Sequence, residues 1–297
     1  VGDQRDEGLR HIRRRLARPA VERVVENFER AFGIVLRRQH IRQRFVILDP
    51  RERAARIEAQ LAAAGGEAKG EAAHLVAEWV DLVEYPTVAI GTVPREFADL
   101  PEVVLETVLA HHQKAVMLPR AADGSPRFAA ITGGDGAAAR NAAQGQERVV
   151  VARLKDARFF YDEDRKRTLA SRVDDLAAVT FHKGLGSYKD KVERLEKLTA
   201  RLASLAGVEG DVAAQAVRAA RLSKADLVTL MVREFPELQG VMGGLYAEAS
   251  ENAAVAEGIR WHYHPVAMEA TAAPAGKVSG DGARVFTLVA LADKLDT

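Results

Sequence analysis

Helical periodicity dominates this chain and is interrupted by a few short strand-like runs. Apolar residues recur at spacings of three and four in residues 4–31, and again after Pro50, which predicts amphipathic helices there. Apolar runs at 87–92 and 128–132 predict strands, and residues 33–48 have the composition for one or two more. The other predicted helices cover 71–82, 102–114, 146–163, 167–178, 187–205, 210–221, 224–233, 236–248, 250–262 and 282–296.

Capping residues and loop residues set the boundaries of these elements. Asp49 precedes Pro50, so we expect Asp49 to be an N-cap for a helix that ends near residues 65–66, a Gly-Gly pair. Ser187 and Ser223 are further N-cap candidates. Residues 133–145 should begin as a loop and turn helical over their alanines, and 271–282 should be a flexible loop. The pattern predicts an α+β fold that is predominantly α-helical, with an α/β region in residues 1–145 and an all-helical domain in residues 146–297.

The composition excludes several classes of protein. The chain has 297 residues, of which 47% are hydrophobic, so it can fill a sizeable core. It has no cysteine, which excludes disulfides and thiolate metal sites. No run of 18 apolar residues and no signal-peptide pattern is found, so we expect no membrane contact and a cytoplasmic location.

Positive charge gathers near the start of the chain, although the net charge is only +1. Residues 1–60 hold 15 arginines against 9 acidic residues, a local balance of +6. Such a basic arm suits a polyanion such as RNA, and Arg13, Arg14, Arg15 and Arg18 are the contacts we expect. An ordinary solvated helix face explains the same arginines equally well.

A second group of basic residues follows a Gly-rich turn in the helical half. Lys183, Lys189, Lys191 and Arg194 lie near the expected start of a helix. Lysine and arginine beside a helix N-terminus can hold an RNA backbone, so these four are further candidates for contacts with such a polyanion. A solvated helix face remains the alternative.

No motif of autonomous catalysis stands out. His111 and His112 are adjacent on a predicted helix and so point about 100° apart, which does not suit one metal ion. His262 and His264 are closer to that requirement only on an irregular helix end. The glycines at 133, 134 and 136 follow a strand, but no Lys-Ser or Lys-Thr follows them, which favours a plain turn over a P-loop. We therefore assign no catalytic residue and no metal site to this chain.

Four blocks of sequence carry a family resemblance. They are GQERVVVARLKDARFFYDED (145–164), GLGSYKDKVERLEKL (184–198), KADLVTLMVREFPELQGVMGGLYA (224–247) and LADKLDT (291–297). With VEYPTVAIG (83–91), HQK (112–114) and PRF (126–128), they resemble the β subunit of bacterial glycyl-tRNA synthetase. EFPELQGVMG (234–243) is the most specific of these strings. The aromatic run 159–161 within the first block is expected to anchor the domain interface rather than stack on RNA bases.

The resemblance implies a supporting role in tRNA aminoacylation. It implies that a separate α subunit binds glycine, ATP and Mg²⁺ and forms glycyl-adenylate, so that no cofactor belongs to this chain. The β subunit would bind tRNA(Gly) and dock to the α subunit, in a possible heterotetramer. Family members continue beyond residue 297, so we expect the sequence to be a fragment.

The helical half also resembles the HD phosphohydrolase fold, and the α/β region resembles part of an editing-type domain. In the HD comparison Ala225-Asp226 matches the His-Asp pair and Asp293 matches the last Asp, so a metal-binding histidine is missing. Asp226 and Asp293 are thus degenerate HD-like positions. Two alternatives to the synthetase hypothesis follow: a metal-dependent nucleotide phosphohydrolase of the HD class, or a stand-alone RNA-binding or assembly module.

Overall fold

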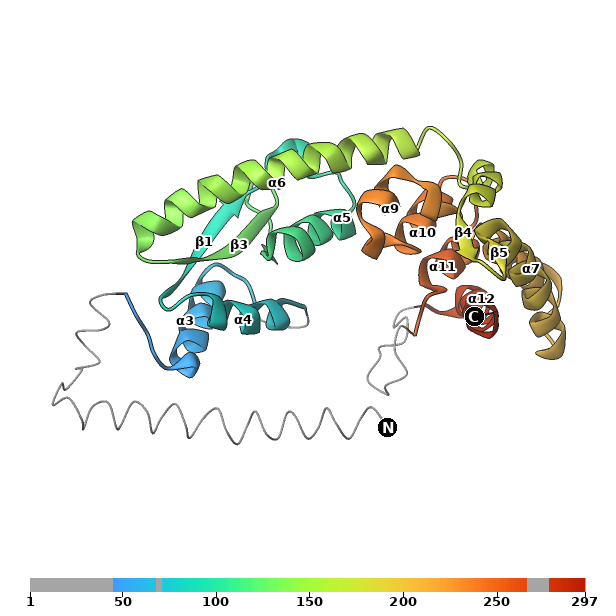
Figure 1. Cartoon of the computed structure of the whole chain (residues 1–297), viewed down its shortest axis with the longest axis horizontal. Helices are drawn as coiled ribbons and strands as arrows, with labels where there is room; N and C mark the ends of the chain where they lie inside the picture. Colours follow the sequence, from blue (N-terminus) through green and yellow to red (C-terminus); the bar gives the residue numbers. More distant parts are fainter. Residues whose placement is uncertain (1–44, 68–70, 266–277, 297) are drawn as a thin grey trace. The chain divides into compact units, whose positions relative to one another are not determined.

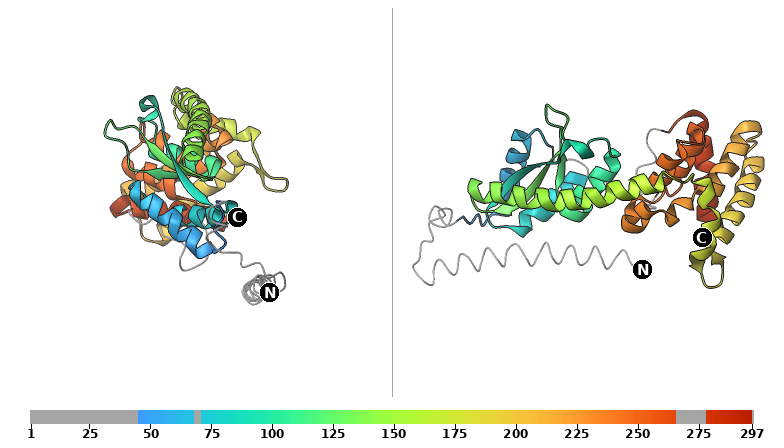
Figure 2. Two further views of the ribbon diagram at one scale, coloured as in Figure 1. Left: turned by 90° about the vertical axis from the view of Figure 1, so that its left-hand side faces the viewer. Right: turned by 90° about the horizontal axis from the view of Figure 1, so that it is seen from above.

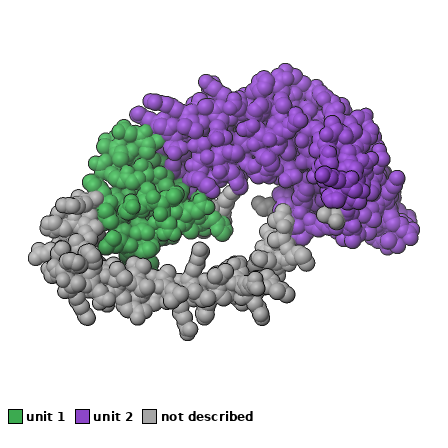
Figure 3. Space-filling view, viewed as in Figure 1, with its two compact units in different colours: residues 1–89, 131–142 green, residues 90–130, 143–297 purple. Residues whose placement is uncertain are grey.

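The computed structural model describes residues 45–67, 71–265 and 278–296. The chain forms two compact units, coloured separately in Figure 3. Unit 1 contains the described residues up to Ala89 together with Ile131–Ala142, and unit 2 contains Ile90–Ala130 and the rest from Ala143. The expected fold class, α+β and predominantly helical, is confirmed.

Unit 1 is built on two packed helices, α3 (Pro50–Ala63) and α4 (Glu71–Leu82). The Asp49 carboxylate accepts a hydrogen bond from the N–H of Arg51, as the predicted N-cap, and the helix ends before the Gly pair. Ile57, Leu61 and Trp79 are fully buried. The expected strands within 33–48 lie mostly outside the described residues, and residues 46–49 are irregular.

A three-stranded sheet has the order β1 (Pro86–Thr92), β3 (Arg127–Gly133), β2 (Val116–Leu118). β2 pairs antiparallel with β3, with Met117 opposite Phe128. The short β2 was not predicted, because three residues are too few to show an alternating pattern. Gly91 lies against the Phe128 ring so closely that a Cβ at this position would collide with it.

The predicted helix 102–114 is shorter and less regular than expected. After the short η1 (Arg95–Phe97), α5 (Glu102–Thr107) continues as a π-helical turn, η2 (Val108–His112). Lys114 follows with a positive φ of 51° and redirects the chain into β2. The wider π turn changes which way His111 and His112 face relative to a regular helix.

One long helix, α6 (Gly136–Asp164), replaces the expected loop and the shorter helix. The helix begins at Gly136 rather than Gln146, because the Asp135 carboxylate accepts the N–H groups of Ala137 and Ala138 and caps it. The glycine-rich stretch thus forms a capped helix start. A carboxylate already occupies the position where a phosphate would bind. The two compact units divide the chain after Ala89, after Ala130 and after Ala142, and the domain boundary expected near residue 145 stays a prediction.

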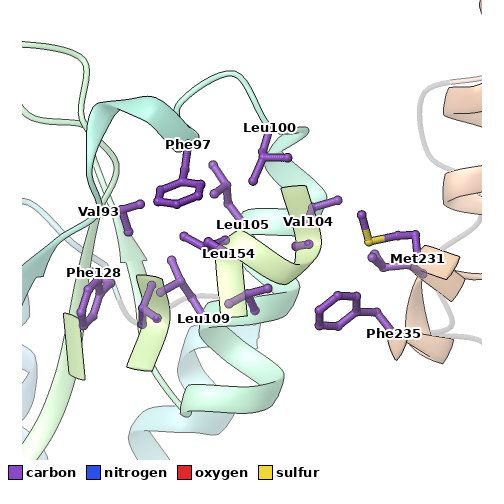
Figure 4. Packing of buried hydrophobic residues seen from close by; sticks show 14 of the residues in the cluster. Val93, Phe97, Leu100, Val104, Leu105, Leu109, Phe128, Leu154, Met231 and Phe235 are labelled. Carbon is purple, nitrogen blue, oxygen red and sulfur yellow. The ribbon is translucent and has the colours of Figure 1, made fainter. Parts of the chain in front are cut away.

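The larger core of unit 2 joins α5, the later part of α6 and the segment 231–246. Figure 4 shows Leu105, Leu109 and Leu154 meeting between the helices, with Phe128 on the sheet side and Met231 and Phe235 on the other. In Figure 1, α6 runs past α5 and on to α9 and α10. Burial of these side chains is the main free-energy source that holds this part together.

Among the described residues, the helical part of unit 2 consists of six α-helices, four 3₁₀ turns and one two-stranded hairpin. Its elements are η3 (Ala170–Arg172), η4 (Asp174–Ala178), β4 (Thr180–His182), β5 (Gly186–Ser187), α7 (Tyr188–Leu205), α8 (Gly210–Leu222), η5 (Ala225–Val228), α9 (Leu230–Glu234), η6 (Pro236–Leu238), α10 (Val241–Ala247), α11 (Ala253–Trp261) and α12 (Gly280–Leu295). In Figure 2, α7 and α8 lie side by side, and both contact α12. Alanines at these crossings, including Ala216, Ala219 and Ala256, allow close approach of the helices.

Several local predictions in this part need correction. The helix expected at 167–178 is two 3₁₀ turns, and a β4–β5 hairpin that was not predicted follows it. Ser187 is an N-cap as predicted, and with Asp190 it completes a capping box. Ser223 is not an N-cap: it ends α8, and its buried hydroxyl donates to the Ala220 carbonyl. Serine side chains compete for nearby carbonyls at helix ends, which makes the two roles hard to separate by sequence.

Candidate functional site

A network of ionisable side chains lies in the helical part of unit 2, and all of it is buried except for Arg194 at its edge, whose side chain is 35% exposed. It contains three basic residues, three carboxylates and one histidine, which come from the start of α7, the α8–η5 connection, the end of α11 and the end of α12. The members are Lys191, Arg194, Lys224, Asp226, His262, Asp293 and Asp296. Buried charges are costly unless they are paired, so the pairing within this network decides what it can do.

Lys224 lies at the centre of this network and is only 1% exposed. Its Nζ atom lies 2.9 Å from Oδ2 of Asp293 and 2.9 Å from Nε2 of His262. The same ammonium sits 3.8 Å from the centre of the Tyr263 ring, a cation–π contact. Burial lowers the pKa of Lys224 to about 8, against the opposing effect of Asp293, so the side chain remains mostly protonated at neutral pH.

The hydrogen bonds of His262 fix its tautomer. Its Nδ1 lies 2.6 Å from the carbonyl oxygen of Ile259, which only accepts, so Nδ1 carries the proton. Nε2 therefore presents a lone pair and accepts a hydrogen bond from Lys224. Complete burial and the neighbouring Lys224 lower the pKa of His262 to about 3, so the ring is neutral.

The carboxylate of Asp226 accepts hydrogen bonds from the backbone at the start of α10. Its Oδ2 accepts the N–H groups of Gly240 at 2.6 Å and Gly243 at 3.0 Å. Gly240 has a φ of +80°, which favours glycine at this position. Burial raises the pKa of Asp226 to about 6 in spite of these two hydrogen bonds. The glycines of EFPELQGVMG thus have a structural role: they let the backbone approach this carboxylate.

The carboxylates of α12 lie in its last turn, where the helix dipole disfavours negative charge. Lys191 offsets this, with Nζ 3.2 Å from both Asp293 and Asp296. Arg194 adds bonds to Asp296 from Nε at 2.6 Å and Nη2 at 3.0 Å. Burial pushes the pKa of Asp293 upward, but Lys224 and Lys191 outweigh it and hold that pKa below the usual value.

A divalent metal ion does not fit this network as it stands. In the part of the chain that the structure describes, no group of three or more His, Asp or Glu side chains is arranged to hold a metal. Asp226 and Asp293 do lie in the same network, as the HD resemblance suggests, but the ammonium of Lys224 takes the position between Asp293 and His262. We therefore derive no metal chemistry from these residues.

The four basic residues that were predicted to contact RNA near the Gly-rich turn lie in different environments. Lys183 is exposed at the tip of the β4–β5 hairpin, and no carboxylate among the described residues pairs with it. Lys189 pairs with Asp174 at 2.8 Å. Lys191 and Arg194 belong to the buried network, and Lys191 is only 2% exposed. Arg13, Arg14, Arg15 and Arg18 lie outside the described residues, so all eight tRNA contacts remain predictions.

The N-terminus of α7 is closed to an added anion. Ser187 and Asp190 cap one another, and the Asp190 carboxylate accepts the Ser187 N–H at 2.6 Å. These bonds hold the pKa of Asp190 below its usual value, so it is charged at neutral pH. An approaching phosphate would meet this negative charge, which leaves the exposed Lys183 as the more accessible cation of the hairpin.

The HQK block contributes a second polar contact within unit 2. His112 Nε2 lies 3.0 Å from Oε1 of Glu237, and its Nδ1 lies 3.3 Å from Arg153. Its ring also meets the edge of Phe235. These bonds join the π turn to α6 and to the EFPELQG block, so His112 serves to connect elements rather than to bind a metal.

The aromatic run in α6 divides between core and surface. Phe160 and Tyr161 pack against the core of unit 2, and their expected role at a domain interface stays a prediction. Phe159, in contrast, is 57% exposed. Arg148 is exposed, whereas Arg158 pairs with Asp99, so the arginines of this helix do not form one basic stripe.

Sequence analysis did not single out Lys224, and it considered His262 only beside His264, as a possible metal-binding pair on an irregular helix end. Lys224 directly precedes the Ala225-Asp226 pair, which was the available signal. Contacts of Lys224 with residues 38 and 69 positions away depend on helix packing, which a single sequence does not show.

Comparison with known proteins places the chain in a class of enzyme subunits, the aminoacyl-tRNA synthetases. The profile of a family described as "Glycyl-tRNA synthetase beta subunit" matches residues 37–297. The chain belongs to this glycyl-tRNA synthetase β subunit family.

Individual relatives agree with the family match. The chain is 41% identical over 260 residues to the glycine–tRNA ligase β subunit of a Picosynechococcus strain, covering 84% of this chain and 36% of that protein. It is 38% identical over 266 residues to the Bacillus subtilis protein of that name, covering 87% and 38%. The Aromatoleum aromaticum protein is 46% identical over 257 residues, covering 85% and 35%. The chain thus spans little more than a third of the length of these relatives.

Among the described residues, no helix is long and apolar enough to cross a membrane.

Proposed function

We propose that this chain acts as part of a glycyl-tRNA synthetase β subunit and supports the ATP-dependent attachment of glycine to tRNA(Gly). The observation that carries the proposal is the family match over residues 37–297, together with 38–46% identity to proteins named glycine–tRNA ligase β subunit. These matches extend through both compact units, so the proposal rests on the whole described fold rather than on one motif.

In this proposal the bond-making chemistry belongs to a separate α subunit. That subunit would bind glycine, ATP and Mg²⁺ and form glycyl-adenylate, and this chain would dock to it and help to hold tRNA(Gly), in a cytoplasmic heterotetramer. Lys224, Asp226 and His262 are each at most 1% exposed and are used in internal contacts. Their burial favours a structural role for the network over a catalytic one. Such groups cannot reach a substrate without rearrangement of the packed helices.

The tRNA contacts that we propose are electrostatic. Lys183 projects at a hairpin tip, and the arginines 13, 14, 15 and 18 belong to the basic arm. Contacts of this kind fix an RNA backbone without reading its sequence, so affinity should fall steeply as the salt concentration rises.

Size-exclusion chromatography with light scattering tests the docking part of the proposal. The chain is mixed with the α subunit from the same source, and the full-length β subunit serves as the positive control. A defined heteromer containing this chain is expected. If full-length β forms the heteromer and this chain elutes alone at the same concentrations, the docking surface is not on these residues.

A filter-binding titration with tRNA(Gly) tests the second part. The chain should bind tRNA with an affinity that falls linearly with salt on a log–log scale. Binding that is indifferent to salt would contradict backbone recognition by these cations.

A further inference from the structure

The tip of the β4–β5 hairpin presents hydrogen-bond donors to the solvent. Residues 182–185 form a β-turn, which is closed by the N–H of Leu185 donating to the carbonyl of His182 at 3.0 Å. The side chains of His182 and Lys183 lie on this turn, and both residues are exposed. Residues 176–189 contain no carboxylate, so the hairpin brings a cation to the surface without an acidic side chain of its own.

The backbone of the turn fixes the tautomer of His182. Its Nδ1 accepts the N–H of Gly184 at 3.1 Å, so the proton of the ring is on Nε2. The tip therefore offers two kinds of donor, the Nε2–H of His182 and the ammonium of Lys183, and phosphate oxygens accept both kinds. The next carboxylate along the chain, Asp190, is already used in the α7 capping box.

Arg194 connects this turn to the end of α12. Its Nη1 donates to the carbonyl of Leu185 at 3.0 Å, while its Nε and Nη2 bind the carboxylate of Asp296 at 2.6 Å and 3.0 Å. One guanidinium thus holds the hairpin and the helix together. A lysine has a single nitrogen on a flexible stem and does not reproduce this fork of donors.

The base of the hairpin is fixed by a second set of contacts. The N–H of Tyr188 donates to the carbonyl of Val179 at 2.8 Å, and the rings of Phe181 and Tyr188 meet edge to face with their centres 5.3 Å apart. The ammonium of Lys191 lies 4.5 Å from the centre of the Phe181 ring. In Figure 1 β4 and β5 lie beside α7, and both strands contact it. An isolated hairpin is only marginally stable in water, so these contacts keep the tip in one position.

The buried network in turn supports Arg194. Lys191 binds Asp296 and Asp293 at 3.2 Å each, so the carboxylate that Arg194 uses is itself held in place. The tip is therefore connected to a preformed set of ion pairs. A binding element that is already fixed loses less conformational entropy when its ligand arrives, which increases the affinity from few contacts.

We propose that the tip of the β4–β5 hairpin contacts an RNA backbone through the Nε2–H of His182 and the ammonium of Lys183, and that Arg194 is a positioning residue that holds the tip in place. This inference rests on the proposed function, because it requires that the chain bind tRNA(Gly). It adds a neutral donor, His182, to the contact surface. It also gives the buried network a part in RNA binding, which the network exerts through the hairpin without touching RNA itself.

The test is a filter-binding titration of tRNA(Gly) across a salt series with the full chain. His182→Ala removes the neutral donor, and Arg194→Lys keeps the charge but loses the bond to the carbonyl of Leu185. Arg221→Lys is the matched control, because Arg221 pairs with Glu196 between α7 and α8 at 3.3 Å and the same change leaves the hairpin contacts intact. Circular dichroism establishes that each variant is folded.

His182→Ala should weaken tRNA binding by about threefold to tenfold and leave the salt slope unchanged, because a neutral donor releases no counterion. Arg194→Lys should weaken binding by a similar factor, and Arg221→Lys should bind like the wild type. In a chain that already carries His182→Ala and Lys183→Ala, Arg194→Lys should have no further effect, since no donor is left for it to position. A purely structural role of Arg194 would not produce this dependence.

Several outcomes would overturn the inference. If the wild type binds tRNA and both His182→Ala and Arg194→Lys bind it as tightly, the hairpin is not a contact, although the proposed function stands. If Arg194→Lys weakens binding equally in the chain without the two donors, it acts through another surface. Hairpin variants that lose only the complex with the α subunit would make the tip a protein contact. A wild-type chain that binds no tRNA contradicts both the inference and the proposed function. Should Arg194→Lys fail to fold, the exposed His182→Ala decides alone.

Discussion

The carboxylate of Asp164, the last residue of α6, accepts a hydrogen bond from the backbone N–H of Met231 at 2.9 Å and thereby caps α9. The same carboxylate accepts the N–H of Leu230 at 3.0 Å and the hydroxyl of Tyr246 at 3.1 Å. Arg172 lies 3.4 Å away as its counter-ion. Asp164 is thus the point at which the long helix is joined to the segment that contains EFPELQGVMG.

Replacing Asp164 should destabilise unit 2 strongly. Asp164→Asn places an amide N–H₂ against groups that are all donors and leaves Arg172 without its buried counter-ion. The expected loss is roughly 2–4 kcal/mol in the free energy of unfolding, measured by urea titration of circular dichroism. The exposed Asp162→Asn is the matched control on the same helix and should stay within about 0.5 kcal/mol of the wild type. Equal effects of the two substitutions would contradict the capping role.

The four blocks noticed in the sequence meet in two places. The blocks that contain Lys191, Lys224 and Asp293 converge on the buried network, and Asp164 links the first block to the third. The sequence predicted most helices here because their apolar periodicity is local. It did not predict the pairing, because each pair joins residues that only packing brings together, as Lys191 and Asp296 show.

The elements predicted least accurately from the sequence were those whose ends or geometry depend on competing local interactions. The start of α6 was missed because Asp135 gives a capping signal only if the following alanines are already taken as helical. Residues 102–114 were predicted as one regular helix. In the structure, residues 108–112 form a π turn, and Val108 and Leu109 of this turn pack into the core. Propensity and periodicity carry no information on such turns.

The glycines of the motifs should respond to substitution in opposite directions. A Cβ on Gly243 would lie 2.9 Å from Oδ2 of Asp226 and 2.9 Å from Ile259, so Gly243→Ala should cost about 1–3 kcal/mol of stability. A Cβ on Gly145, inside α6, meets nothing within 4 Å, so Gly145→Ala should add about 0.5–1 kcal/mol. Urea unfolding of both variants measures this. A stabilising Gly243→Ala would show that α10 is not held tightly against Asp226.

The buried His262 should make the free energy of unfolding depend on pH in the acid range. The pKa of His262 is lowered from 6.5 to about 3, so the unfolded chain binds one more proton between these values and stability falls as the pH falls below 6.5. Asp226 acts in the opposite sense, because its pKa is raised from 3.8 to about 6 and the folded chain takes up its proton first. The two effects should nearly cancel between pH 6 and about 4.

His262→Gln should break this cancellation. Without the imidazole, the pH slope of the unfolding free energy between pH 6 and about 4 should differ from that of the wild type by up to about 1.4 kcal/mol per pH unit, in the direction of relative stabilisation in acid. Urea titrations at three pH values give the slopes, and other acidic groups cancel in the comparison. Parallel slopes for the two proteins would mean that His262 is accessible to protons in the folded state.

The two lysines flanking the α7 capping box should separate RNA binding from stability. Lys183→Ala changes an exposed residue, so stability should stay within about 0.5 kcal/mol while the salt slope of tRNA binding falls by about one. Lys191→Met removes a cation that serves two carboxylates and should cost roughly 3–5 kcal/mol of stability. A Lys183→Ala variant that binds tRNA with unchanged affinity and slope would remove the hairpin from the contact surface.

The largest expected effect on tRNA binding comes from the arginines of the basic arm. Replacing Arg13, Arg14, Arg15 and Arg18 by glutamine removes four positive charges from the +6 segment, which should lower tRNA affinity and reduce the salt slope by up to about four. Replacing the same four by lysine is the matched control, because it keeps the charge and should keep the slope even if the affinity changes. Filter binding across a salt series distinguishes the two variants. If the glutamine variant has the slope of the wild type, these arginines form a solvated face and the RNA contacts lie elsewhere in the protein.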